Sequence, residues 1–453
     1  MSIREEIEAA KLAGDFITIE GGVPLRGEIT VRGAKNFVSK AMVASLLASK
    51  KGETVSVLRN VPKIRDVEVV SKLLELHGAK VDVDVEKGQV TIDVGHLSQP
   101  EIADVDTLAG SSRIPILFCG PLLHRLGEAF IPSLGGCNIG GRPLDFHFDA
   151  LRQFGATIEK TKGGVKISAP NGLKGVKIKL PYPSVGATEQ ILLTAVLAKG
   201  KTELKNAAIE PEIMDEIDVL QKMGAIISVD TDRVIHIEGV EELKGYNHFS
   251  LPDRIEAGSW ACAALSTKGD VFIKGAQQSD MSTFLNMFRK IGGEFDIKDD
   301  GIRFYYSPDN RSHSIALETA VHPGFMTDWQ QPFVVALTQV EGLSIVHETV
   351  YENRLGFTEA LNLMGAQIQL YKECLGSKAC RFAERNFEHS AAIVGPTKLQ
   401  GAEILVPDLR GGFSYLIAAL TAEGKSTVYG ISLIDRGYEM FRDKLTALGA
   451  NFK

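Results

Sequence analysis

LLELHGAKVDV (residues 73–83) combines the apolar end of a helix, a glycine and the start of an alternating strand. The same pattern recurs in five further segments: LRQFGATIEK (151–160), LQKMGAIISV (220–229), FRKIGGEFDI (288–297), LNLMGAQIQL (361–370) and LTALGANFK (445–453). Successive turn glycines lie 68 to 84 residues apart, at Gly78, Gly155, Gly224, Gly292, Gly365 and Gly449. Glycine is favoured where a helix ends in a left-handed turn, because a Cβ is penalised there. The pattern therefore predicts six copies of one supersecondary unit.

A second repeat alternates with the first and places an Ala- and Leu-rich helix before a turn and a strand. Examples are VASLLASKKGETVSVLRNV (43–61), LLTAVLAKGKTELKNAA (192–208), ACAALSTKGDVFIKGA (261–276) and LIAALTAEGKSTVYGIS (416–432). These helices are apolar almost all round, which indicates burial on several sides, and the strands alternate with period two. We therefore expect an α/β (α+β) protein of two similar lobes, each with three units and with buried helices walled by sheets.

Length and composition limit the class of protein. The chain has 453 residues, of which 24% are charged and 44% belong to the AVILMFWYC group, as is usual for a globular protein. The net charge of −7 argues against broad nucleic-acid binding. No apolar run reaches the length of about 18 residues that indicates a membrane span, and the charged N-terminus lacks the apolar region of a signal peptide. Five cysteines are too few for a disulfide framework, so we expect a reducing cytoplasm.

Two loops are candidate functional segments. Lys35 and Asn36 follow a predicted strand and open a helix, where both side chains could face an anion, although a solvated turn lysine is the simpler interpretation. The segment SLGGCNIGGRP (133–143) has four glycines and predicts a loop. Its Cys137, beside Arg142, is either an accessible reactive thiol or one of the inert apolar cysteines that are common in proteins.

Scattered arginines and one aspartate carry further alternatives. Three of the arginines, Arg354, Arg410 and Arg436, have an acidic residue within two positions, so they form either surface ion pairs or carboxylate-oriented anion clamps. Asp328, in HPGFMTDWQ (322–330), is either a helix cap, which the sequence favours, or a general base. Cys374 and Cys380 have no His at a spacing typical of zinc sites, so we expect no metal.

These segments together resemble the enolpyruvyl transferase family over nearly the whole chain, from about Thr18 to Lys453. The motifs that carry the resemblance are GAKN, NVPKIRDV, GGCNIGGRPLDFH, SVGAT, EPEIMD, LPDRIEAG, HPGFMTDWQ, ETVYENR, PDLRGG and IDRGYE. The resemblance implies two inverse α/β prism domains with six βαβαββ repeats. The expected first domain comprises residues 1–34 and 252–453 and contains both termini, and the second comprises residues 35–251 and carries the Cys137 loop.

The resemblance also implies an activity and its residues. The branch that fits best transfers the enolpyruvyl group of phosphoenolpyruvate to the 3-hydroxyl of UDP-N-acetylglucosamine in the cytoplasm, at the first committed step of peptidoglycan synthesis. It needs no metal and no organic cofactor, and fosfomycin is the expected inhibitor. The implied catalytic residues are Cys137 as proton donor, Asp328 as base and Lys35. The implied phosphoenolpyruvate contacts are Lys35, Asn36, Arg142, Arg410 and Arg436. The implied nucleotide-sugar contacts are Arg113, Arg142, Pro143, Leu144, Asp145, Phe146, Ser184, Val185, Gly186, Asp328 and Val350, with Arg354 and Asp408 in support.

Several departures from the family pattern keep other acceptors open. Tyr182 and Pro183 stand where the family often has a lysine before SVGAT, and Arg65 stands where a lysine is frequent. The segment 371–403, which begins at YKECLGSK, is longer than in typical members, and residues 1–16 are extra. The alternatives are a paralogous transferase that uses another nucleotide or phosphorylated acceptor, and a non-catalytic nucleotide-sugar-binding homologue.

Overall fold

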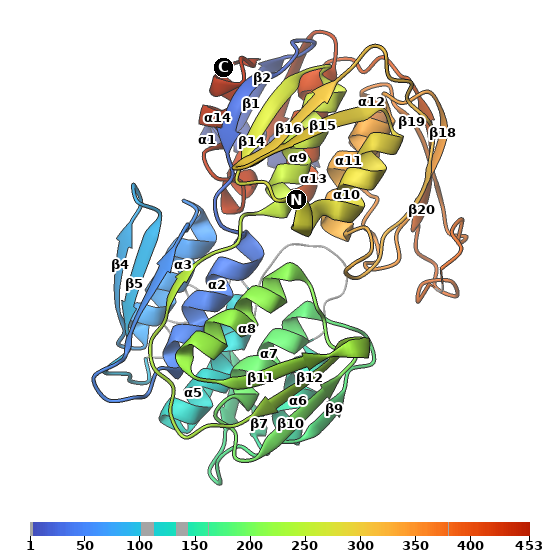
Figure 1. The fold of residues 1–453 in the computed structure, drawn as a ribbon. Helices are drawn as coiled ribbons and strands as arrows, with labels where there is room; N and C mark the ends of the chain where they lie inside the picture. The colour runs from blue at the N-terminus through green and yellow to red at the C-terminus, as the bar shows by residue number, and fades with distance from the viewer. Residues whose placement is uncertain (1–2, 101–112, 133–143, 162, 379) are drawn as a thin grey trace. The chain divides into compact units, whose positions relative to one another are not determined.

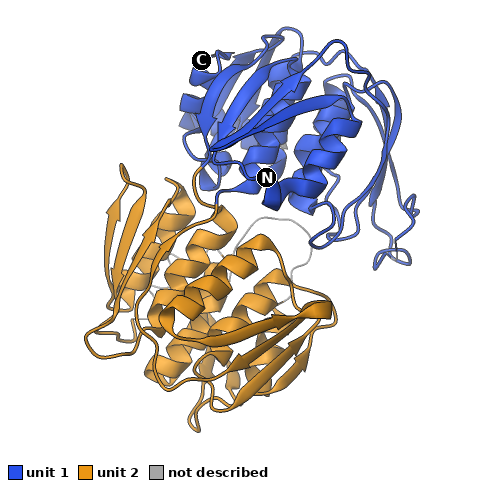
Figure 2. Ribbon diagram, viewed as in Figure 1, with its two compact units in different colours: residues 1–31, 137–142, 252–453 blue, residues 32–136, 143–251 orange. Residues whose placement is uncertain are grey.

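The structure is a computed structural model that describes residues 3–100, 113–132, 144–161, 163–378 and 380–453. The chain divides into two compact units (Figure 2). The first contains the chain up to Val31 and from Pro252 to Lys453, and the second runs from Arg32 to Leu251 apart from the undescribed segments. Within the described ranges, no helix has both the length and the apolar character needed to cross a bilayer.

The first unit has three four-stranded sheets. In spatial order, the strands of one sheet are β21 (Glu403–Leu405), β22 (Lys425–Tyr429), β1 (Phe16–Glu20) and β23 (Asn451–Phe452). Those of another are β15 (Gly293–Lys298), β16 (Gly301–Tyr306), β14 (Asp270–Lys274) and β2 (Arg26–Thr30). Those of the third are β17 (Ala316–Glu318), β18 (Gly342–His347), β20 (Ser390–Gly395) and β19 (Gln367–Tyr371). In each sheet three strands pair antiparallel and one edge strand joins them in parallel, as β2 does with β14. The parallel strand comes from another part of the chain, so it ties the repeats together.

Three helices form the centre of the first unit and contact one another (Figure 1). They are α9 (Arg254–Ser266), α11 (Thr327–Leu337) and α13 (Leu409–Thr421). Every residue of α9 is buried, as the all-round apolar sequence predicts. The outer helices are α10 (Gln278–Lys290), α12 (Thr358–Leu363) and α14 (Phe441–Ala447). Helix α1 (Ile3–Ala13) contacts β21 and β22, and the 3-10 helix η4 (Ile431–Arg436) contacts α13. Helix α10 buries one face only, through Met281, Phe284, Leu285 and Phe288.

The second unit repeats this plan. One of its sheets has the strand order β13 (Asn247–Phe249), β3 (Val55–Arg59), β5 (Gln89–Asp93) and β4 (Lys80–Asp84). Another has the order β11 (Ile226–Asp230), β12 (Val234–Glu238), β10 (Lys201–Lys205) and β9 (Lys177–Lys179). The third has the order β6 (Glu128–Pro132), β8 (Gly164–Ser168) and β7 (Thr157–Thr161). Its inner helices are α2 (Lys35–Ala44), α5 (Cys119–Leu126) and α7 (Val185–Ala195), and its other helices are α3 (Arg65–Leu76), α6 (Asp145–Gln153), α8 (Pro211–Met223), η1 (Ser45–Leu47), η2 (Ile114–Phe118) and η3 (Thr231–Arg233).

The predicted six repeats and the inverse α/β prism class are confirmed. Each repeat runs from an inner helix to a strand, an outer helix and a hairpin, and one of the six turn glycines follows each outer helix within two residues. All six adopt the left-handed backbone, with φ between 75° and 111°. A side chain is strained in that conformation, which is why glycine recurs there.

Candidate active site

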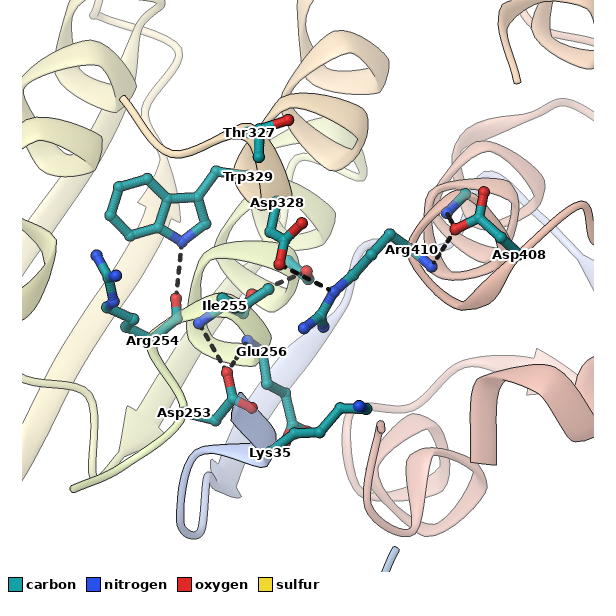
Figure 3. Close-up of polar contacts among 12 residues, drawn as sticks. Lys35, Asp253, Arg254, Ile255, Glu256, Thr327, Asp328, Trp329, Asp408 and Arg410 are labelled. Carbon is teal, nitrogen blue, oxygen red and sulfur yellow. Dashed lines mark hydrogen bonds and ion pairs between the residues drawn. The ribbon is translucent and has the colours of Figure 1, made fainter. Parts of the chain in front are cut away.

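An aspartate and two arginines meet in the first unit. Figure 3 shows the aspartate, Asp328, with one of the two, Arg410. Asp328 lies in the first turn of α11, Arg354 follows β18, and Arg410 lies in the first turn of α13. Arg354 Nη2 donates a 2.6 Å hydrogen bond to Asp328 Oδ1, and Arg410 Nε lies 3.5 Å from Asp328 Oδ2. The arginine side chains are 1% and 5% exposed, against 17% for the aspartate. The carboxylate is therefore the accessible end of a buried cationic cluster.

The helix-cap interpretation of Asp328 is wrong. Helix α11 begins after Met326, and no side chain caps its N-terminus. The Asp328 carboxylate instead pairs with the side chains of the two arginines.

Glu348 holds the segments on both sides of this cluster, and sequence reasoning missed it. It is fully buried and follows β18 directly. Its carboxylate accepts hydrogen bonds from Thr327 Oγ1 at 2.9 Å and from the backbone amides of Val350 and Tyr351 at 2.7 and 3.0 Å. Burial raises the pKa of Glu348, and the charge of Arg354 opposes that shift. The only signal was its place in the motif ETVYENR.

Helix α9 is fixed against the same site. Asp253 caps α9 by accepting from the amides of Ile255 and Glu256 at 2.8 and 3.0 Å (Figure 3). Trp329 Nε1 donates to the Arg254 carbonyl at 2.9 Å, which joins the start of α9 to the start of α11.

The acidic residues next to the arginines in sequence do not form the pairs that their spacing suggests. Asp408 accepts from the amides of Arg410 and Gly411 at 2.8 and 3.1 Å, so it caps α13 and fixes the arginine's backbone. The Arg354 partner, Asp328, lies 26 residues away. The acidic neighbour of Arg354 in sequence, Glu352, pairs instead with Arg381 at 3.9 Å. The acidic neighbour of Arg436, Asp435, pairs with Arg442 at 3.2 Å. Arg436 ends η4 and is half-buried.

The buried arginines keep donors without partners. Among the described residues, Arg354 Nε and Nη1 and Arg410 Nη1 are buried and have no hydrogen-bond acceptor. Burial lowers the pKa of Arg410, but Asp328, Tyr438 and Asp253 outweigh that effect and hold it above its ordinary value. A buried guanidinium with unpaired N–H groups is costly unless an anion satisfies it. The cluster is therefore built to accept an anion.

In the second unit, Lys35 is an ion-pair partner at the start of a helix. Lys35 is the first residue of α2, and its Nζ lies 2.6 Å from Asp66 Oδ2 in the first turn of α3. Their side chains are 17% and 6% exposed. Asn36 follows in α2 and is half-buried, and its carbonyl accepts from Lys40 at 2.7 Å.

His147 connects several of the predicted nucleotide-sugar contacts. It is buried in α6, and its ring lies so close to Gly186 that a Cβ there would meet the ring at 3.2 Å. Burial lowers its pKa to about 4, and the nearby charge of Arg113 adds to the effect. Helix α6 and the SVGAT segment thus meet at this ring, and the charge of Arg113 acts on it. His147 was not among the predicted residues, and only its position at the end of a motif pointed to it.

The other predicted residues occupy less constrained positions. Leu144 and Phe146 are half-buried and pack against the core of the second unit, whereas Asp145 is exposed. Ser184 caps α7 by accepting from Ala187 N at 3.4 Å, and Val185 opens that helix. Val350 is buried in the first unit. Cys137, Arg142 and Pro143 lie outside the described residues.

Comparisons with known proteins agree with this architecture. A family model described as EPSP synthase (3-phosphoshikimate 1-carboxyvinyltransferase) matches residues 19–445. The chain belongs to this family of enolpyruvyl transferases.

Curated relatives narrow the comparison within the family. The chain is 51% identical to UDP-N-acetylglucosamine 1-carboxyvinyltransferase of Protochlamydia amoebophila, over 96% of this chain and 94% of that protein. It is 41% identical to the enzyme of the same name from Acidiphilium cryptum, over 97% and 99%. Among solved structures, the enolpyruvyl transferase NikO from Streptomyces tendae matches with a TM-score of 0.85 at 21% identity, over 97% of this chain and 98% of that one. EPSP synthase from Acinetobacter baumannii matches with a TM-score of 0.72 at 18% identity, over 97% and 99%. The solved structures support the fold.

Proposed function

We propose that the chain transfers the carboxyvinyl group of phosphoenolpyruvate to the 3-hydroxyl of UDP-N-acetylglucosamine and releases phosphate, the first committed step of peptidoglycan synthesis, in the cytoplasm. Its relatives at 41–51% identity carry the name of that activity over nearly their full length. The observation that carries the proposal is the set of unpaired, buried guanidinium donors beside Asp328. Both substrates are anions, and fixed cations offset their mutual repulsion even in an acidic chain.

Asp328 is the proposed base. Its carboxylate has one oxygen on Arg354 and the other facing Arg410, so its position is fixed while 17% of its side chain remains accessible. A base must reach the proton that it removes, and a preorganised group needs no reorganisation when it reacts. In the proposed step Asp328 takes the proton of the acceptor hydroxyl as that oxygen bonds to C2 of phosphoenolpyruvate.

The second half of the reaction completes the transfer. As the hydroxyl adds to C2, a proton from the Cys137 thiol goes to C3, and a tetrahedral intermediate forms. The intermediate then loses a proton from C3 and the C2–O bond to phosphate breaks, so the enol ether re-forms and inorganic phosphate leaves. The role of Cys137 rests on the family resemblance, and so does the expectation that fosfomycin alkylates it.

The remaining residues divide between the two substrates. We assign Lys35, Asn36, Arg142, Arg410 and Arg436 to phosphoenolpyruvate. We assign Arg113, Arg142, residues 143–146 and 184–186 and Val350 to the nucleotide sugar. The close approach of His147 to Gly186, and the effect of the Arg113 charge on His147, support a common site for the described members of this set in the second unit.

A phosphate-release assay with three acceptors tests the proposal. We expect release that depends on UDP-N-acetylglucosamine, with little release on UMP or shikimate 3-phosphate, because a site built to pair polar groups rejects an analogue that leaves them unpaired. Turnover of UMP or shikimate 3-phosphate alone would replace the acceptor assignment with a paralogous one. Binding of the nucleotide sugar without any turnover would instead support the non-catalytic homologue.

A further inference from the structure

Four potential metal ligands gather where three strands of one sheet end. His347 is the last residue of β18, His389 directly precedes β20, and Cys374 and Cys380 lie between β19 and β20 (Figure 1). Ser390 pairs in register with His347 and with the last residue of β19, so all these segments meet at the same end of the sheet. One ligand atom from each of the four side chains lies within 4.8 Å of every other.

Hydrogen bonds fix both imidazoles so that Nε2 carries the lone pair. The Ser390 hydroxyl donates its one proton to the Glu373 carbonyl at 2.7 Å, so its oxygen accepts from His347 Nδ1 at 2.8 Å. His389 Nδ1 donates to the Phe387 carbonyl at 2.8 Å. In both rings Nδ1 therefore holds the hydrogen and Nε2 is an acceptor. Metal-binding histidines are oriented in this way by an outer partner on the second nitrogen.

The two Nε2 atoms and the two sulfurs face one another. His347 Nε2 is buried and has no hydrogen-bond partner among the described residues. His389 Nε2 lies 3.4 Å from Cys374 Sγ. Cys380 Sγ accepts from the Phe382 amide at 3.3 Å, a contact that stabilises negative charge on sulfur. A buried lone pair without a donor, beside two thiols, is an unexplained polar group that a cation satisfies.

We propose that His347, Cys374, Cys380 and His389 bind a structural Zn²⁺ ion. Two thiolates and two imidazoles are a tetrahedral zinc ligand set. Zinc bond lengths of roughly 2.0–2.3 Å place tetrahedral ligand atoms roughly 3.3–3.8 Å apart, so closing the cluster around the ion needs movements of about 1 Å or less. Sequence spacing does not reveal this ligand set, because the fold brings His347 to the two cysteines from another strand, β18.

A second group of potential metal ligands, two aspartates and a histidine, differs from the His347 cluster in its neighbours. Asp215, Asp218 and His248 also lie close enough to hold an ion. There, however, Lys222 Nζ lies 2.7 Å from Asp218 and 2.9 Å from His248 Nδ1, so an ammonium group already supplies the positive charge. Among the described residues, no lysine or arginine is hydrogen-bonded to a ligand atom of the His347 cluster.

The zinc ion would link the long connection between β19 and β20 to the end of β18, next to residues of the proposed active site. His347 immediately precedes Glu348, which holds Thr327 and the amide of Val350. The same connection donates to Glu318 through Ser377 and Lys378 at 2.8 Å, and Arg381 donates to the Val350 carbonyl. We therefore expect the ion to order this connection and, through it, the segment that carries Arg354.

Metal analysis of the purified full-length protein tests the proposal. We expect about one zinc per chain by elemental mass spectrometry, the stoichiometry of a single four-ligand site. Cobalt exchanged into the protein should give thiolate charge-transfer and tetrahedral d–d absorption bands. Cys374→Ser and Cys380→Ser should lose most of the zinc, whereas Cys380→His, which keeps four ligands, should retain it with weaker charge-transfer absorption.

Control variants separate the site from general effects. Cys262→Ala removes a buried thiol of α9 that lies outside the cluster, and His313→Ser removes an exposed histidine, so both should keep the zinc. Zinc content no higher than that of the double variant Cys374→Ser/Cys380→Ser would overturn the proposal. A disulfide between Cys374 and Cys380, found by peptide mapping without reductant, would overturn it as well. Neither readout depends on transferase activity.

Discussion

Asp328→Asn tests the proposed base most sharply, because asparagine keeps the shape of aspartate and one acceptor oxygen but cannot take the proton. General-base catalysis contributes about 10²–10⁴-fold, which corresponds to about 3–5 kcal/mol of transition-state free energy. We expect kcat to fall within this range. The low-pH limb of the kcat profile that reports ionisation of the base should also disappear.

The same substitution removes the negative charge between two buried guanidinium groups. Breaking a buried ion pair costs about 3–5 kcal/mol in general. We expect the lower end, about 3 kcal/mol, because the Asp328 side chain is 17% exposed and water screens part of the charge. The loss should appear as a lower urea midpoint in phosphate-free buffer, since phosphate would occupy the vacant cations.

The assay is coupled phosphate release at saturating substrates, with urea denaturation of the same preparations. Asp230→Asn is the matched control, because Asp230 is exposed and its Oδ1 only accepts from the Thr231 amide at 2.8 Å. Asparagine caps a helix about as well as aspartate does, so this control should keep its rate and stability. A wild-type rate for Asp328→Asn would refute the base assignment, and an unchanged urea midpoint would refute the electrostatic role.

Three further predictions concern other parts of the molecule. Burial and the nearby Glu189 raise the pKa of Glu216 well above its usual value, so its contribution to stability is complete below the unfolded pKa and is lost as pH rises through the folded pKa. Glu216→Gln should therefore gain stability relative to wild type as the pH rises from about 5, just above the unfolded pKa, to about 8; a constant difference in urea midpoints over this range would contradict the prediction. Cys137→Asp should retain turnover, because a carboxylic acid also donates a proton, but should resist fosfomycin; mass spectrometry that finds the adduct on another residue of wild type would contradict the assignment. Removing zinc with a chelator should lower the melting temperature and speed hydrogen exchange in residues 372–389, because a metal that binds only the folded state stabilises it, by about 2.7 kcal/mol at 100 times its Kd; unchanged exchange there would argue against the site.

Local sequence patterns predicted the repeats because they reflect local physical requirements. Gly78 and its five counterparts are needed wherever a helix ends in the left-handed region, and that requirement is visible in a few consecutive residues. Helix α9 is buried all round, and its sequence has no polar face to suggest otherwise. The order of strands in each sheet depends on parallel partners from distant segments, such as β2 with β14, and no local pattern encodes it.

The site was less predictable for the same reason. Arg354 pairs with Asp328, 26 residues away, whereas Glu352, two residues away, pairs with Arg381. The fold determines which carboxylate the arginine meets, and distance along the sequence does not. Glu348 acts through backbone amides and a threonine, and a single buried glutamate has no sequence signature of that role. His147 matters through its contact with a glycine of another helix, which only the packing reveals.

Product analysis in deuterium oxide tests the proposed transfer most directly. The protein is incubated with phosphoenolpyruvate and UDP-N-acetylglucosamine, and the product is examined by mass spectrometry and NMR. Because C3 gains a solvent-derived proton on addition and loses one on elimination, we predict a UDP-N-acetylglucosamine product with a carboxyvinyl group on the 3-hydroxyl and deuterium on the vinyl methylene carbon. A product without deuterium would contradict addition and elimination, and no carboxyvinyl product at all would contradict the proposed function.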